Sequence, residues 1–168
     1  QQSETIPQAA INTFGAVQDV VDILGTASSI NFSNYQLEYG FGSTPNSWIL
    51  IDQSDQIVIN SILGQWNTRS LAEGLYTIRL TVTNDLGEVN QKLRILEVDN
   101  VNLKTPIQNE QLIYKVILEI NGSVRGDGLT SYTIEYGLGA EPSTWLSNGI
   151  TVQDNGQQEK NKELLASW

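Results

Sequence analysis

The chain has 168 residues, of which 9 are basic and 19 acidic, giving a formal net charge of −10, and it contains no cysteine and no histidine. This composition excludes disulfide bonds, thiolate chemistry, zinc sites built on Cys or His, and a Ser-His-Asp system built from this chain alone. It has no basic cluster to neutralise phosphates and no apolar run long enough to span a bilayer. We therefore expect no nucleic-acid partner and no membrane insertion.

The predicted elements are β-strands, because apolar residues recur with a period of two and almost never with helical spacing. The chain opens with Gln1–Ile6, a polar segment that we expect to be flexible. The strand candidates that follow, in chain order, are Val20–Leu24, Tyr35–Tyr39, Trp48–Ile51, Ile57–Ile59, Leu75–Thr83, Val89–Val98 and Tyr132–Tyr136. Asn84–Gly87 is a turn signal that predicts a hairpin between the Leu75–Thr83 and Val89–Val98 strands.

The chain repeats itself. Tyr35–Trp48 (YQLEYGFGSTPNSW) and Tyr132–Trp145 (YTIEYGLGAEPSTW) share seven of fourteen residues at a constant offset of 97. A second match pairs Ile62–Trp66 with Leu164–Trp168, at an offset five residues longer. A period near 100 residues is typical of an array of whole domains rather than of a solenoid.

The repeat and the polar segment before Pro106 predict the domain organisation. We expect a flexible segment at residues 1–6, a first β-sandwich at residues 7–100, a linker at residues 101–106 and a partial second sandwich at residues 107–168. Copy two has no counterpart of residues 67–100 of copy one, and so lacks the C-terminal strands of the sandwich. The charged loop Gln153–Glu163 is expected to be the most mobile part of copy two.

The pattern L-x-x-G-x-Y, at Leu71–Tyr76, is typical of the strand that opens at the corner of a Greek-key sandwich. A tyrosine in that position buries its ring and returns its hydroxyl to nearby backbone. The alternative, a catalytic Tyr76, lacks a titratable partner in the pattern. We therefore expect Tyr76 to be structural.

The repeated acids and tryptophans are the other functional candidates. Glu38 and Glu135 could be glycosidase carboxylates, but each copy has only one, so pairing with a cross-strand Arg or Lys is the favoured interpretation. Trp48 and Trp145 could stack on sugars, whereas the favoured interpretation is a core or inter-strand tryptophan.

Calcium is the remaining alternative. Asp99, Asn100, Asp127 and Asp154 could supply oxygen ligands, but no D-x-D-x-D-G loop is present, and solvated turn residues are the favoured interpretation. The sequence therefore predicts no catalytic, cofactor-binding or metal-binding residue, and no enzymatic activity.

Three blocks of copy one resemble a bacterial immunoglobulin-like or fibronectin-III-like repeat: Tyr35–Trp48, Leu63–Thr68 and Leu71–Gly87. Copy two carries the first part of the same pattern. The resemblance implies tandem immunoglobulin-like Greek-key sandwiches in an extracellular or cell-surface protein. The lack of an initiator methionine at Gln1 is typical of a processed piece of such a protein.

We expect the function that this resemblance implies to be non-enzymatic: a structural or adhesive module of a stalk, adhesin or filament. The alternative is a carbohydrate-binding or accessory module of a secreted hydrolase, with a glycan as ligand. The expected partners are neighbouring repeats or like subunits. Copy two is either cut short by a boundary or completed by a strand donated from a neighbouring molecule. Gln1–Ala10 is a possible donor, although its alternation is poor.

Overall fold

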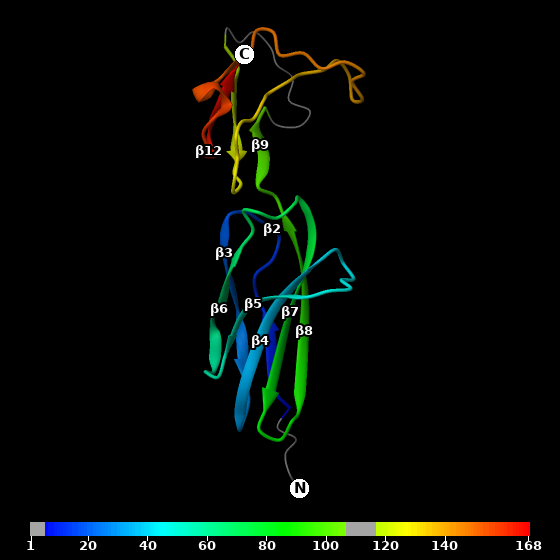
Figure 1. The fold of residues 1–168 in the computed structure, drawn as a ribbon, viewed down its shortest axis with the longest axis vertical. Helices are drawn as coiled ribbons and strands as arrows, with labels where there is room; N and C mark the ends of the chain where they lie inside the picture. The colour runs from blue at the N-terminus through cyan, green and yellow to red at the C-terminus, as the bar shows by residue number, and fades with distance from the viewer. Residues whose placement is uncertain (1–5, 107–116) are drawn as a thin grey trace. The chain divides into compact units, whose positions relative to one another are not determined.

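The computed structural model describes residues 6–106 and 117–168 of the chain (Figure 1). Strands make up most of these residues, and the described part of the chain contains no α-helix, only the short 3₁₀ turn η1 (Gln153–Gly156). The predicted all-β fold class is confirmed. The chain divides into two compact units, unit 1 (Gln1–Asp99) and unit 2 (Asn100–Trp168), each of which holds one copy of the sequence repeat.

Unit 1 is built from two sheets. The three-stranded sheet has the order β1-β3-β6, and the five-stranded sheet has the order β2-β8-β7-β4-β5. Neighbours are antiparallel except for β2, which pairs parallel with β8. The strands of the unit are β1 (Gln8–Ile11), β2 (Ala16–Val17), β3 (Val20–Ser28), β4 (Phe32–Phe41), β5 (Ile49–Ser54), β6 (Val58–Asn67), β7 (Gly74–Asn84) and β8 (Val89–Val98).

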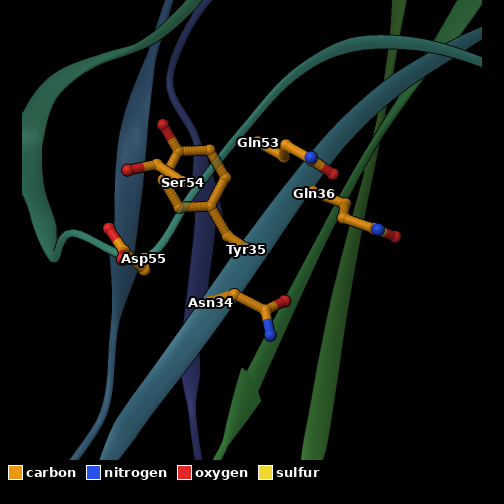
Figure 2. A pocket seen from close by; sticks show the side chains of 6 residues that line it. All are labelled: Asn34, Tyr35, Gln36, Gln53, Ser54 and Asp55. Atoms are coloured by element: carbon orange, nitrogen blue, oxygen red, sulfur yellow. The ribbon is translucent and has the colours of Figure 1, made fainter.

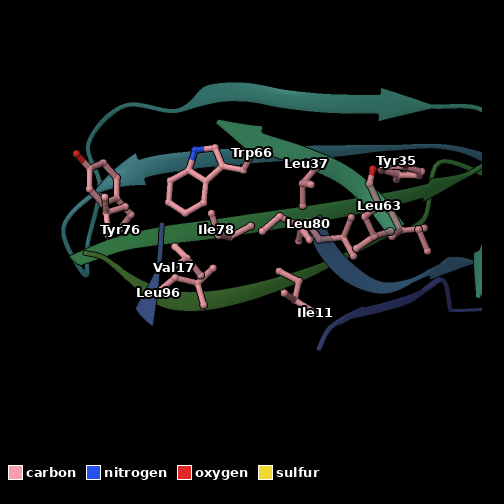
Figure 3. Close-up of a cluster of buried hydrophobic side chains, with 14 residues drawn as sticks. Ile11, Val17, Tyr35, Leu37, Leu63, Trp66, Tyr76, Ile78, Leu80 and Leu96 are labelled. Atoms are coloured by element: carbon pink, nitrogen blue, oxygen red, sulfur yellow. Dashed lines mark hydrogen bonds between the residues drawn. The ribbon is translucent and has the colours of Figure 1, made fainter. Parts of the chain in front are cut away.

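The core of unit 1 lies between the two sheets, which is the arrangement of a β-sandwich (Figure 3). The alternation predicted for β7 is what the structure has: Tyr76, Ile78, Leu80 and Val82 are all buried. They meet Ile23 and Leu63 of the opposite sheet, which are also buried. Burying both inner faces stabilises the unit by roughly 25 cal/mol for each Å² of apolar surface removed from water.

The predicted hairpin between β7 and β8 is confirmed. Its ladder runs without a shift from Gly74↔Val98 to Thr83↔Val89. In the turn, the backbone N–H of Gly87 donates to the carbonyl of Asn84. Gly87 has a φ of 79°, in the left-handed region that glycine adopts without steric cost.

Unit 2 contains one four-stranded sheet with the order β11-β12-β10-β9. Its strands are β9 (Val101–Thr105), β10 (Glu119–Val124), β11 (Thr151–Val152) and β12 (Lys160–Ser167). Leu118, Ile120 and Ala166 form a small buried cluster on one face of this sheet. The pairing of β10 with β12 has the register of β3 with β6, because Ile120 lies opposite Ala166 as Ile23 lies opposite Gly64.

One segment of the predicted domain organisation has a different structure, and two others lie outside the described residues. Residues 101–105, predicted as part of a linker, form β9 and pair with β10, so their backbone groups are satisfied within the sheet of unit 2. Residues 1–5 and 107–116 lie outside the described residues, and with them most of the predicted flexible segment and the first residues predicted for the second sandwich.

The strand predicted at Tyr132–Tyr136 is wrong. This segment forms only one isolated bridge, between Tyr136 and Leu146. The equivalent strand of unit 1, β4, is held by β7 on one side and β5 on the other. Residues 117–168 contain no counterpart of β7, so the ladder that would define a strand at Tyr132–Tyr136 is missing on that side.

Candidate functional site

The residues shared by the two copies form the same local contacts in both units. The Tyr35 hydroxyl donates to the carbonyl of Leu63 at 2.6 Å, and the Tyr132 hydroxyl donates to the carbonyl of Leu165 at 3.2 Å. Each bond joins the repeated block to a later strand of the same unit, β6 (Leu63) or β12 (Leu165). Burial raises the pKa of both tyrosines, with Asp52 adding to the effect at Tyr35. These hydroxyls therefore stay protonated and continue to donate well above neutral pH.

A second shared contact holds a bulge in β6 and β12. Asn60 and Lys162 occupy the same register and both have positive φ, 47° and 58°. The N–H of Asn60 donates to the Thr26 hydroxyl at 3.0 Å, and the N–H of Lys162 donates to the Ser123 hydroxyl at 3.1 Å. A hydroxyl on the neighbouring strand thus satisfies the backbone group that the bulge removes from the ladder.

The loop after the repeated tyrosines has the same geometry in both units. A Cβ on Gly40 would lie 2.4 Å from Cβ of Pro45, and one on Gly137 would lie 2.3 Å from Cβ of Pro142. Only glycine allows the two ends of the loop to approach this closely. Figure 1 shows that the loop between β4 and β5 projects from the body of unit 1. The close approach of the repeated glycine and proline therefore fixes the shape of a projecting loop.

Tyr76 has the structural role predicted for it. Its ring is buried, and its hydroxyl donates to the carbonyl of Ala72 at 3.1 Å. Burial raises its pKa, with the neighbouring Tyr39 adding to the effect. The ring packs edge-on against Trp66 with centroids 5.7 Å apart. The tyrosine therefore closes one end of the sandwich core.

Glu38, Trp48 and Arg79 form a cluster on the outer face of the five-stranded sheet. The Glu38 carboxylate pairs with the Arg79 guanidinium at 2.7 Å, which confirms the predicted cross-strand partner. The same guanidinium lies over the Trp48 ring, 4.0 Å from its centroid. Of the two favoured interpretations, core or inter-strand, the core one is wrong for Trp48. The ring is half-buried on the outer face and packs against the Arg79 cation of another strand.

The equivalent residues of unit 2 have a different environment. Trp145 is 56% exposed, so the core prediction is wrong for this residue too. Glu135 is exposed, and Arg79 has no counterpart near it because residues 117–168 contain no equivalent of β7. Both residues line a groove of about 360 Å³, whose other walls are mainly apolar.

A polar cleft of about 570 Å³ lies on unit 1, lined by Asn34, Tyr35, Gln36, Gln53, Ser54 and Asp55 (Figure 2). Figure 2 shows Gln36 and Gln53 extending away from the Tyr35 ring. The Ser54 hydroxyl and the Asp55 carboxylate accept hydrogen bonds from Gln56, and the Tyr35 hydroxyl is held by Leu63. The lining offers hydrogen-bonding groups, but the Ser54 hydroxyl and the Asp55 carboxylate each bond to Gln56 rather than to each other.

Among the described residues, the three aspartates weighed as calcium ligands, Asp99, Asp127 and Asp154, do not gather into one group. Asp154 pairs with Lys160, whose pKa is raised chiefly by that hydrogen bond. Asn100 is buried, and its carbonyl accepts the N–H of Arg125. Asp127 is exposed in a turn. Across residues 6–106 and 117–168, no three Asp, Glu, His or Cys side chains gather as a metal site would require.

Residues of the repeated framework, such as Tyr35 and its counterpart Tyr132, make contacts that the sequence pattern did not predict. The constant offset between the copies did single these residues out. The hydroxyls of Thr26 and Ser123 were missed, because a single hydroxyl beside a strand has no sequence signature. No helix of the described ranges is long and apolar enough to cross a membrane.

Comparison with known proteins adds little. No protein-family model matches the chain, and no curated protein matches it. One solved structure that is similar to it is the crystal structure of an engineered protein, at 14% identity and a TM-score of 0.40. The match covers 55% of this chain and 20% of that one, so the chain spans a fifth of the engineered protein's length.

Proposed function

We propose that the chain is a non-enzymatic structural or adhesive module, built from tandem immunoglobulin-like units, of an extracellular or cell-surface protein. The strand order of unit 1 supports the fold part of this proposal. A sheet of β1, β3 and β6 facing a sheet of β2, β8, β7, β4 and β5 is the order of an immunoglobulin-like Greek key, with Tyr76 at its corner.

The functional part of the proposal depends on one observation: the residues repeated in both units make structural contacts. Tyr35, Gly40 and Pro45 hold strands and loops together in unit 1, and their counterparts do the same in unit 2. The residues that the two copies share are thus framework residues, as is expected of units repeated in a tandem structural array. Localisation outside the cell rests on the resemblance to bacterial surface repeats.

Expression of residues 7–100 alone tests the modular part of the proposal. We expect this fragment to unfold in one cooperative transition, because its core cluster contains residues of unit 1 only. A broad, non-cooperative transition in chemical denaturation, followed by far-UV circular dichroism, would contradict it.

A glycan array and a panel of hydrolase substrates test the functional part. We expect neither binding nor turnover, since the Trp48 ring is covered by Arg79 and the polar cleft has no reactive pair. Trp145 is the best exposed aromatic candidate, so Trp145→Ala is the informative variant and Trp48→Ala its matched control. Saturable glycan binding that only Trp145→Ala abolishes would favour a carbohydrate-binding module instead.

A further inference from the structure

The inner face of β7 covers a defined set of residues in unit 1. Val82, Leu80 and Ile78 lie opposite Tyr35, Leu37 and Tyr39 of β4, and these three β7 side chains are fully buried. Below them are Leu63 of β6 and Ala27 of β3, both at most 1% exposed. Because the two units share this sequence, unit 1 shows that β7 is the strand that packs against these residues.

Unit 2 keeps the residues that β7 covers. The counterparts of Tyr35 and Leu37 are Tyr132 and Ile134, and those of Leu63 and Ala27 are Leu165 and Val124. All four counterparts line the groove of about 360 Å³. Its remaining walls come from β9, from Thr133 and Glu135, and from Trp145. The groove thus lies where β7 lies in unit 1.

The backbone beside the groove has an open edge. Both backbone groups of Tyr136 bond to Leu146, on the side away from the missing strand. Successive residues of an extended strand present these groups to alternate sides, so those of Thr133 and Glu135 face the groove. Within the described part of the chain, the backbone of these two residues makes no hydrogen bond to other backbone groups.

The charge beside the groove also has a counterpart in unit 1. Glu38 pairs with Arg79, which β7 presents on its outer face. Glu135 occupies the position of Glu38 in unit 2, where β7 has no counterpart among residues 117–168. A strand that entered the groove in the register of β7 would bring its outward residue against Glu135, and a basic residue there would complete the pair.

We propose that the groove of unit 2 in this 168-residue chain binds a β-strand from another polypeptide, antiparallel to Tyr132–Tyr136. The occupant carries apolar side chains at alternate positions and an Arg or Lys opposite Glu135. It adds backbone hydrogen bonds to Thr133 and Glu135, in the manner of β-strand addition. This inference rests on the proposed function, in which the two units are tandem copies of one immunoglobulin-like fold.

The probe is a synthetic peptide with the sequence of Gly74–Val98, the β7–β8 hairpin of this chain, labelled for fluorescence anisotropy. We expect saturable binding at one peptide per chain. Glu135→Pro removes an N–H that would bond the added strand and should weaken binding about tenfold, whereas the control Glu135→Ala keeps that N–H and should weaken it less. A charge exchange, Glu135→Lys with Arg79→Glu in the peptide, should restore part of the affinity.

Hydrogen exchange gives a readout that does not depend on a variant folding. The amides of Thr133 and Glu135 should exchange freely in the isolated chain and become protected when the peptide binds. Three results would overturn the proposal: no saturable binding, binding indifferent to Glu135→Pro, or protection of these amides in the isolated monomer, which would mean that the chain fills its own groove. Protection that appears only in a dimer, identified by light scattering across a dilution series, would assign the groove to a second copy.

A fusion locates the binding site. Appending a second copy of residues 67–98 after Trp168 places the β7–β8 sequence where it stands in unit 1, so peptide binding should be lost. Peptide binding that survives in the fusion would place the peptide elsewhere and would overturn the proposal. The modular part of the proposed function is tested on residues 7–100, which lack the groove, so that test and the strand-binding test can each fail without the other.

Discussion

Units 1 and 2 share their local contacts and differ in what those contacts enclose. The Trp66 ring lies tilted against Tyr39 with centroids 5.3 Å apart, and the Trp168 ring stacks on Tyr136 with centroids 4.3 Å apart. Trp66 is only 2% exposed, however, while Trp168 is 42% exposed. Local sequence is therefore enough to set strand register, bulge and loop, whereas burial of the same side chains depends on the second sheet.

Gly64 shows that the second sheet also restricts which residues unit 1 can accept. A Cβ on Gly64 would lie 2.7 Å from Cβ of Asp52, on β5 of the facing sheet. Unit 2 has Ala166 at the equivalent register, and that residue is fully buried without the constraint. The complete sandwich restricts this position to glycine because a second layer approaches it.

The largest expected difference between the units is at the two tryptophans. Trp66→Ala removes a buried ring and should cost unit 1 about 3–5 kcal/mol of unfolding free energy. Trp168→Ala removes a partly exposed ring and should cost unit 2 roughly 1 kcal/mol, the size of a single aromatic pair. Chemical denaturation of each variant measures both values. Equal losses would mean that the Trp168 ring is as well enclosed as that of Trp66.

The next largest effect should be common to both units. A Cβ on Gly25 or on Gly122 would lie 2.1 Å from a backbone oxygen of the neighbouring strand, that of Ala10 or Asn102. Gly25→Ala and Gly122→Ala should each destabilise their unit by about 1–3 kcal/mol through overpacking. Gly15→Ser is a control at a glycine with positive φ and nothing within 4 Å, where strain acts without a clash. If Gly122→Ala caused no loss of stability, β9 would not lie as close to β10 as β1 lies to β3.

Tyr76→Phe tests a contact of unit 1 that has no counterpart among residues 117–168. The loss of its hydrogen bond to Ala72 should cost on the order of 1–2 kcal/mol. The denaturation midpoint of the fragment 7–100 measures this loss, and Tyr39→Phe is a control on the same aromatic cluster. An unchanged midpoint for Tyr76→Phe would show that the hydroxyl contributes nothing to the corner.

Alkaline pH should produce the smallest and most gradual effect. Burial raises the pKa of Tyr35 and Tyr76 in the folded state above the value of about 10 expected in the unfolded chain. Their contribution to stability is therefore complete below pH ~10 and is lost as the pH rises above it, because the unfolded state then releases protons more readily. Thermal melting between neutral and alkaline pH measures the slope, which Tyr76→Phe should reduce. A melting temperature that increased as the pH was raised beyond ~10 would contradict the expected loss of stability.

The sequence was sufficient for elements whose pattern and partner are both local. The β7–β8 hairpin, the buried side of β7 and the Tyr76 corner follow from alternation and turn residues within one short stretch. The sequence was insufficient where a neighbouring strand determines whether a segment becomes a strand. Val101–Thr105 reads as a polar linker, and only its pairing with β10 makes it a strand. Tyr132–Tyr136 alternates as well as Tyr35–Tyr39 does, yet it forms no strand without a neighbour equivalent to β7.

Trp48 illustrates a different limit. A large apolar ring before a strand is more often buried than not, and the sequence favoured that interpretation. The ring instead lies on the outer face because Arg79, 31 positions farther along the chain, covers it from β7, which β4 separates from β5. A contact between a partly buried cation and a ring across a sheet leaves no periodic pattern in the sequence of either strand.

The first and last strands of unit 1 are tied to each other, and this has a mechanical consequence. Asn90 and Arg94 of β8 donate to the carbonyls of Pro7 and Ile11 at the two ends of β1, at 2.7 and 3.0 Å. The parallel pair Ala16↔Glu97 and Val17↔Val98 adds backbone bonds between β2 and β8. Tension applied between the two ends of the unit pulls these strands past each other lengthwise. The bonds are then strained together in shear rather than opened one after another, which is the geometry in which a small set of hydrogen bonds resists force best.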